Sequence, residues 1–293
     1  MIPWITYCDA ITEALRVEMR VDPTIVCLTA STNGRSRPTD ELAHEFGTSR
    51  VREYDAGPSI LAAAAAAASE GLRPVCELEM GALRGAGAEA LKEVASSGAL
   101  VIRVVSDGTA WPADADLAGM KSVSPATAAD AKGLLASAIQ DPDPVLFMEA
   151  PDLYSVVCDG VPEGSHTVAL GDARLVRRGS DAVVFAHGAA SVAAERAAQD
   201  VGGAVALVDV RSLAPLDRHA IETTVRDTGK VLIVSEPGAP PEFSATLVRL
   251  IYEDMPQLLD APIRELGGPS WSATPNGRWV EDVKEACTEL VAF

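Results

Sequence analysis

The chain has 293 residues, 48% of them hydrophobic and 23% charged, which is long and apolar enough to bury the cores of two soluble domains. Its 42 acidic and 24 basic side chains leave a formal net charge of −18. This balance argues against binding to nucleic acid, which needs clustered Lys and Arg, and against binding to an anionic membrane surface.

The cysteines and the N-terminal segment narrow the class of protein further. No Cys-x-x-Cys pair occurs, which argues against a zinc ribbon and a disulfide framework. The N-terminus lacks a basic segment followed by an apolar one, and no apolar run reaches the length of a membrane span. We therefore expect a cytoplasmic protein. The five cysteines are Cys8, Cys27, Cys76, Cys158 and Cys287.

Helical and strand patterns alternate along the first half. Ile11, Leu15 and Met19 share one face of a helix predicted over residues 7–20, and Thr6 is its expected cap. The alanine tract 62–68 continues a further helix, and residues 106–117 have the composition of an irregular loop. The other predicted elements are strands at 24–29, 74–78, 99–105 and 144–149 and helices at 86–97 and 127–140.

The pattern is interrupted and then resumes. Between residues 151 and 171 the periodicity disappears while Pro, Gly, Asp and Ser accumulate, which predicts a connection between two domains, 1–164 and 165–293. Alternation of helices with strands that are apolar on both faces predicts an α/β fold with mostly parallel sheets. The elements predicted after the connection are strands at 173–176, 182–186, 204–210, 230–235 and 262–266 and helices at 191–199, 217–227, 244–252 and from 280.

Four blocks of sequence carry a family resemblance. They are Ser124-Pro125 with residues 130–135, 138–145 and Leu153-Tyr154; Asp-Val-Arg-Ser-Leu-Ala-Pro-Leu-Asp at 209–217; Gly-Leu-Arg-Pro-Val at 71–75; and Asp-Ala-Pro-Ile at 260–263. In this order and spacing the chain resembles, from about residue 6 to 291, the beta subunit of the decarboxylating component of 2-oxo acid dehydrogenases. The resemblance implies the thiamine diphosphate-binding fold: a transketolase-like pyrimidine-binding domain, then a transketolase C-terminal-like domain.

The resemblance also implies a cofactor and a partner. Thiamine diphosphate would lie between two subunits, with its diphosphate and Mg held by an alpha-type chain through a Gly-Asp-Gly motif and a later Asn. Gly171-Asp172-Ala173 is the nearest match in this chain, whose only asparagines are Asn33 and Asn276. An alpha-type partner is therefore expected, with beta–beta contact in an α2β2 heterotetramer. The implied substrate is a small 2-oxo acid or a ketose.

The expected pyrimidine site departs from the family pattern. The family places a catalytic Glu about fourteen residues before Gly71, where this chain has Gly57 or Pro58, and the nearest acids are Asp55 and Glu53. The loop after the first strand reads Thr-Ala-Ser at 29–31 instead of carrying an acid, and the loop 107–117 is short and lacks His. No catalytic residue is assigned. The residues expected beside the ring are Asp55, Gly57, Ser59, Met80 and Leu83, the last two at positions that carry aromatic residues in the family.

Three further groups of residues have alternative interpretations. A structural potassium ion is one possibility at Ala138, Ile139, Asp141 and Asp143, and an ordinary Asp-Pro turn is the other. His187 follows a strand and could touch a substrate or a partner, or serve only structure. Glu77 and Glu79 share one face of a strand. One of them could be an acid of the pocket, or they could lie at a subunit interface.

These observations leave two hypotheses. The chain is the beta-type subunit of a thiamine diphosphate enzyme that decarboxylates a 2-oxo acid or transfers a two-carbon unit. Alternatively, it is a non-catalytic scaffold or regulatory partner that retains the interface and has lost the pyrimidine pocket.

Overall fold

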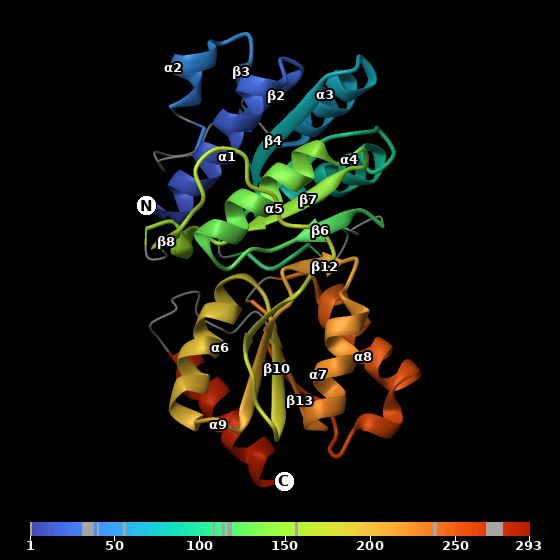
Figure 1. Cartoon of the computed structure of the whole chain (residues 1–293). Helices are drawn as coiled ribbons and strands as arrows, with labels where there is room; N and C mark the ends of the chain where they lie inside the picture. The colour runs from blue at the N-terminus through green and yellow to red at the C-terminus, as the bar shows by residue number, and fades with distance from the viewer. Residues whose placement is uncertain are drawn as a thin grey trace. The chain divides into compact units, whose positions relative to one another are not determined.

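The computed structural model describes residues 2–30, 38–39, 41–54, 57–107, 109–112, 115, 119–155, 158–236, 239–267 and 278–293. Contacts within the chain divide it into two compact units, Met1–Leu170 and Gly171–Phe293 (Figure 1). Both units are α/β, as the alternating pattern predicts. The assignment of residues 1–164 and 165–293 to two named domains stays a prediction.

A parallel sheet forms the centre of the first unit. Its strands lie in the order β6-β7-β5-β4-β2-β3, and every neighbouring pair is parallel. All five residues of β5 and of β7 are buried, and all except Arg103 and Glu149 are apolar, as is typical of parallel strands covered on both faces. The strands are β2 (Ile25–Ala30), β3 (Val51–Tyr54), β4 (Arg73–Glu79), β5 (Val101–Val105), β6 (Lys121–Val123) and β7 (Val145–Glu149).

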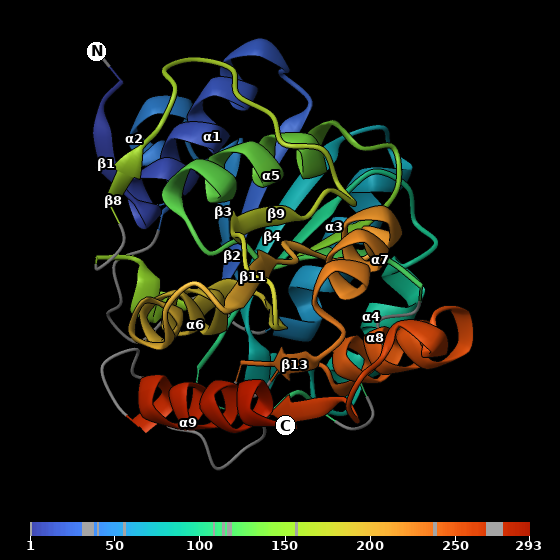
Figure 2. The same ribbon diagram turned by 60° about the horizontal axis from the view of Figure 1, so that its bottom comes forward.

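Helices cover both faces of this sheet (Figure 2). α1 packs against α5 on one face, and α3 packs against α4 on the other. α1 begins where the sequence predicts, because the Thr6 hydroxyl accepts from the Asp9 N–H (3.1 Å) and the Asp9 carboxylate accepts from the Thr6 N–H (3.4 Å). The helices are α1 (Tyr7–Val21), α2 (Leu42–Phe46), α3 (Gly57–Ser69), α4 (Ala86–Val94) and α5 (Ala128–Gln140), with short 3-10 turns η1 (Met80–Leu83) and η2 (Pro151–Leu153).

A two-stranded sheet joins the two ends of the first unit. β1 (Trp4–Thr6) pairs antiparallel with β8 (Cys158–Gly160). Just beyond β8, Val161 packs with Ala10 of α1 and Ala128 of α5. The sequence predicts only an irregular connection here, because strands of three residues have no measurable periodicity and depend on non-local pairing.

The second unit is a smaller α/β layer structure. Its sheet has the order β14-β13-β10-β11-β9, in which only the β9–β11 pair is antiparallel. α6 packs against α9, and α7 packs against β10. The elements are β9 (Arg174–Arg177), β10 (Ala182–Ala186), α6 (Gly188–Val201), β11 (Val205–Asp209), β12 (Ser212–Ala214), α7 (Arg218–Thr228), β13 (Val231–Val234), α8 (Pro241–Asp254), η3 (Pro256–Leu258), β14 (Arg264–Leu266) and α9 (Arg278–Ala292).

The predicted strands and helices of both units are present, with shifted ends. β1, α2, β3, β6, β8 and β12 are additional to the prediction. Within the described part of the chain, no helix combines the length and apolar character that crossing a bilayer requires.

Candidate active site

The carboxyl ends of the parallel strands define the candidate site of the first unit. β3, the next strand in sequence, pairs with one edge of β2. β4 pairs with the opposite edge of β2, and β5 lies beyond β4. This reversal of direction lies between β2 and β4, and open α/β sheets bind ligands outside the carboxyl ends of the strands at such a point. Four of the positions expected beside the ring, Gly57, Ser59, Met80 and Leu83, are described, and they follow β3 or β4, so they lie at this edge.

The position expected to carry the catalytic Glu is the first turn of α3. Gly57 is the first residue of this helix, Pro58 the second, and Ser59 the third and exposed. The first turn contains no acidic residue. Asp55 lies outside the described residues. The described part of this edge therefore offers no carboxylate from α3.

Met80 and Leu83, at the positions expected to lie beside the ring, are both buried in η1. Gly81 between them donates its N–H to Asp107 Oδ2 at 3.0 Å, and a Cβ on this glycine would lie 2.8 Å from that oxygen. Asp107 Oδ1 accepts from the N–H and hydroxyl of Thr109. Burial acts to raise the pKa of Asp107, but the hydrogen bonds from Thr109 and Gly81 outweigh it and lower the pKa. The loop after β5 thus fastens η1 in place.

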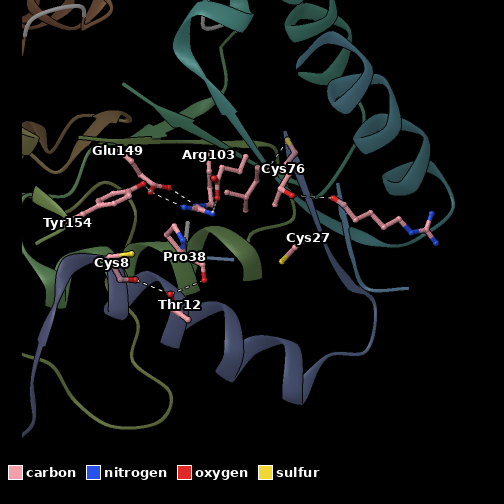
Figure 3. Close-up of polar contacts among 12 residues, drawn as sticks. Cys8, Thr12, Cys27, Pro38, Cys76, Arg103, Glu149 and Tyr154 are labelled. Atoms are coloured by element: carbon pink, nitrogen blue, oxygen red, sulfur yellow. Dashed lines mark hydrogen bonds and ion pairs between the residues drawn. The ribbon is translucent and has the colours of Figure 1, made fainter. Parts of the chain in front are cut away.

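A buried ion cluster crosses the sheet below this edge (Figure 3). Arg103 on β5 donates through Nε (2.6 Å) and Nη2 (2.8 Å) to the Glu149 carboxylate at the end of β7. Its Nη1 lies 2.6 Å from Glu77 Oε2 on β4. The Tyr154 hydroxyl donates to Glu149 Oε2 at 2.6 Å. Glu77 is therefore held inside the first unit by Arg103, and it is only 4% exposed.

The cluster keeps its charges because its members compensate one another. Burial acts to lower the pKa of Arg103, but Glu149 and Glu77 raise it well above its usual range. Burial raises the pKa of Tyr154 well above its usual range, and the charge of Glu149 adds to this, so the phenol is a neutral donor. Burial, then Asp9, raises the pKa of the nearby Cys8 thiol to about 11, which leaves it a poor nucleophile. The sequence gives little signal for this cluster, because Arg103 lies in an apolar strand.

The residues expected to hold potassium make other contacts. The Arg73 guanidinium donates to the carbonyl oxygens of Ile139 (2.8 Å) and Asp141 (3.3 Å). Lys121 Nζ lies 2.8 Å from Asp141 Oδ1 and 2.9 Å from Asp143 Oδ2. Among the described residues, no three His, Cys, Asp or Glu side chains are grouped to hold a metal ion. Two side-chain cations thus already neutralise this turn, which does not fit an additional potassium ion.

Ala138 and His187 both lie in the interior. Ala138 is buried within α5. His187 precedes α6 in the second unit, and its ring lies 4.8 Å from that of Phe243 in an edge-on arrangement. Burial lowers the pKa of His187 to about 3, so the ring is neutral. The structure favours the structural interpretation of this histidine.

The described residues do not fit the pyrimidine ring of thiamine diphosphate in the way that the resemblance implies. The first turn of α3 has no acid, and Met80 and Leu83 present no exposed stacking face.

Comparisons with known proteins identify the family. Residues 171–279 match the family "Transketolase, C-terminal domain". The chain is 33% identical to the 2-oxoisovalerate dehydrogenase subunit beta of Bacillus subtilis (strain 168), over 98% of this chain and 99% of that protein. It is 32% identical to the beta subunit of the acetoin:2,6-dichlorophenolindophenol oxidoreductase of the same organism, over 90% of this chain and 89% of that one.

A solved structure with the same fold is the split gene transketolase described as an inactive beta4 tetramer. The two chains share a TM-score of 0.74 and 20% sequence identity, and the match covers 98% of each chain. The fold is therefore transketolase-like over both units. With a third of its residues shared over nearly the full length of a 2-oxoisovalerate dehydrogenase beta subunit, the chain belongs to the family of 2-oxo acid dehydrogenase beta subunits.

Proposed function

We propose that this chain is the beta-type subunit of a thiamine diphosphate-dependent enzyme that decarboxylates a small 2-oxo acid or transfers a two-carbon unit from a ketose. A separate alpha-type chain supplies the diphosphate and Mg site, and the two form an α2β2 assembly in the cytoplasm. The observation that carries the proposal is the match to beta subunits along 98% of the chain. The lack of a Gly-Asp-Gly motif with a downstream Asn in this sequence supports a partner that provides it.

The protein's contribution in such an enzyme is to position and tune the cofactor, while the cofactor carries the carbanion chemistry. Gly57 and Pro58 cannot supply the carboxylate that the family uses for tuning. An active enzyme of this type would therefore need a carboxylate from another position. Alternatively, it would catalyse a reaction that depends less on proton transfer at the cofactor.

A second candidate function rests on the lack of a carboxylate at Gly57 and Pro58. Where relatives place their acid, α3 starts with Gly57 and Pro58, and the neighbouring Met80 and Leu83 are buried. These features support a non-catalytic beta-like scaffold or regulatory partner. Thiamine diphosphate binding separates the two candidates, because only the first requires it.

The experiment is to co-purify the chain with an alpha-type protein encoded beside it, and to titrate the complex with thiamine diphosphate and Mg. The first candidate expects saturable binding and decarboxylation of at least one member of a 2-oxo acid panel. Complex formation without binding or turnover would instead support the second candidate. Failure of the two chains to associate would contradict both.

A Gly57→Glu variant tests whether only the tuning acid is missing. Restoring a general acid–base group at the start of α3 should raise turnover by roughly tenfold or more if the rest of the pocket is competent. Thr288→Glu, on the exposed side of α9 in the second unit, is the control and should leave turnover unchanged. Equal rates for wild type and Gly57→Glu would show that the pocket has changed beyond this one residue.

A further inference from the structure

A cavity of about 460 Å³ lies in the second unit, beside the end of β12, the start of α7 and the later turns of α8 (Figure 1). Its size is within the range of small-molecule sites. All of its described lining residues belong to the second unit, and they come from two separate stretches of the chain. The wall has an apolar part and a charged part.

Aliphatic side chains form the apolar part of the wall. Leu213 of β12 is 3% exposed and Leu250 of α8 is 8% exposed, so both are anchored in the core of the unit. The exposed Pro215 and the half-buried Leu216, which connect β12 to α7, add further apolar surface. Covering such surface with an aliphatic group removes apolar area from water, which is favourable. This part of the wall therefore fits a small hydrocarbon side chain.

One face of α8 supplies the polar part of the wall. Thr246, Arg249 and Glu253 follow one another at intervals of three and four residues, so their side chains lie on the same side of the helix. Arg249 and Glu253 are both exposed. Within the described ranges of the chain, neither side chain has an ion-pair or hydrogen-bond partner. Both charged groups are thus available to a ligand.

Arg249 and Glu253 also form no ion pair with each other. A pair four residues apart on an exposed helix is weak, and it is weaker when the cation precedes the anion, as it does here. The other two charged residues of the wall are already paired, because Arg218 at the start of α7 contacts Asp254 at the end of α8. The cavity therefore offers one guanidinium and one carboxylate about one helical turn apart.

This combination of charges selects a zwitterion. A simple anion attracted by Arg249 would be repelled by Glu253, and a simple cation would meet the opposite balance. An α-amino acid carries its carboxylate and its ammonium on the same carbon atom, so each group can meet its opposite charge. Both contacts are then charge-assisted hydrogen bonds, which are stronger than neutral ones.

We propose that this cavity binds a free α-amino acid with an aliphatic side chain. The Arg249 guanidinium donates to the ligand carboxylate, and the Glu253 carboxylate accepts from the ligand ammonium. Leu213 and Leu250 contact the aliphatic side chain. The site is independent of the proposed function, because it requires neither an alpha-type partner nor thiamine diphosphate.

The test uses the full chain, without partner or cofactor, and three probes that share one branched carbon skeleton. Leucine carries both charges, 4-methyl-2-oxopentanoate carries only the carboxylate, and 3-methylbutylamine carries only the ammonium. Calorimetry and ligand-observed NMR measure binding. Leucine should bind saturably, and each singly charged probe should bind roughly tenfold more weakly, as expected for loss of a charge-assisted hydrogen bond. If leucine does not bind, or if either other probe binds as tightly as leucine, the proposal is wrong.

Two variants locate the site, and each has its own pattern across the probes. Arg249→Gln should weaken binding of leucine roughly tenfold without weakening that of 3-methylbutylamine, which has no carboxylate. Glu253→Gln should weaken binding of leucine by a similar factor without weakening that of 4-methyl-2-oxopentanoate, which has no ammonium. Both side chains are exposed, so the melting temperature should not change.

Each variant has a matched control in the same unit. Arg178→Gln, just beyond β9, and Glu242→Gln, in the first turn of α8, change exposed side chains that do not line the cavity. Both controls should leave the affinity for leucine unchanged. An affinity within about twofold of wild type in either cavity variant would overturn the proposal.

Discussion

At the scale of single residues, Arg103 of β5 connects its strand to both neighbouring strands of the first unit. It is fully buried and makes hydrogen bonds of 2.6–2.8 Å to the carboxylates of Glu77 and Glu149. Removing a partner from a buried ion cluster leaves uncompensated charge in a low-dielectric interior, which is far more costly than losing a surface pair. The cluster therefore fixes the relative positions of β4, β5 and β7.

Arg103→Met should lower the free energy of unfolding by about 3–5 kcal/mol, because two carboxylates would remain buried without their cation. Urea denaturation measures this change. Arg226→Met is the control, since Arg226 pairs with Glu222 on the exposed surface of α7 and its loss should change stability by less than about 1 kcal/mol. Similar values for the two variants would contradict the role assigned to the cluster.

His187 makes the stability of the second unit depend on pH. Burial lowers its pKa from 6.5 to about 3, so the folded chain excludes a proton that the unfolded chain binds. The stabilisation from neutral His187 is complete above pH 6.5 and is lost as the pH falls toward 3, by about 1.4 kcal/mol per pH unit. This loss adds to that of the carboxylates.

A His187→Met variant should therefore lose less stability than wild type between pH 7 and pH 4.5. The quantity to compare is the slope of unfolding free energy against pH, measured by urea titration, because the absolute stability also changes with packing against Phe243. Equal slopes for the two proteins would show that His187 does not titrate between folded and unfolded states.

At the scale of elements, Arg73 connects the start of β4 with the end of α5. Its guanidinium binds carbonyl oxygens of Ile139 and Asp141, while Lys121 of β6 neutralises the Asp141 carboxylate. The Asp141 hydrogen bond, with that of Asp143, raises the pKa of Lys121, so the ammonium stays charged. These two cations contact oxygen atoms of Ile139, Asp141 and Asp143, three of the four residues expected at the potassium site.

The melting temperature of the wild-type chain should consequently be the same in potassium and sodium chloride at equal ionic strength. Arg73→Gln removes the guanidinium and should lower stability by about 1–3 kcal/mol, because the carbonyl oxygens lose a charged donor. Differential scanning fluorimetry in the two salts provides the measurement. A clear stabilisation of wild type by potassium alone would restore the metal-site interpretation.

The elements also show why the sequence predicts some of the fold and misses the rest. α1 is predicted correctly because its cap, Thr6, and its apolar face are both local features. β3 and β6 are missed because they contain four and three residues, and they form through pairing with β2 and β7. Charged residues within β3, such as Arg52 and Glu53, also obscure its strand pattern.

At the scale of the whole molecule, α3 is the surface helix with the least polar character. Ala62 and Ala66 are exposed on the same side as Ser59 and Ser69, and no charged residue interrupts the helix. On a chain with a net charge of −18, an uncharged helix face allows close approach of another helix. We propose that this face forms part of a subunit contact in the assembly.

Ala66→Glu should leave the fold intact, because the residue is exposed, but should reduce subunit association about tenfold or more through a buried, unpaired charge. Sedimentation velocity of the purified protein measures the assembly. Glu70→Gln, just beyond the helix, is the matched control. Unchanged assembly of Ala66→Glu would place the contact elsewhere.

The sequence by itself determined the family, the α/β class, and the absence of an acidic residue from the first turn of α3, because these depend on local patterns and on the order of motifs. Only the tertiary structure decided which charges meet. Strand register brings Glu77, Arg103 and Glu149 together, and chain folding places the Arg73 guanidinium on the turn expected to hold potassium. A cavity lined by Thr29, Thr39 and Tyr54 likewise joins residues of β2, of the segment before α2 and of β3. Such contacts depend on the pairing of distant strands, which no local pattern of residues encodes.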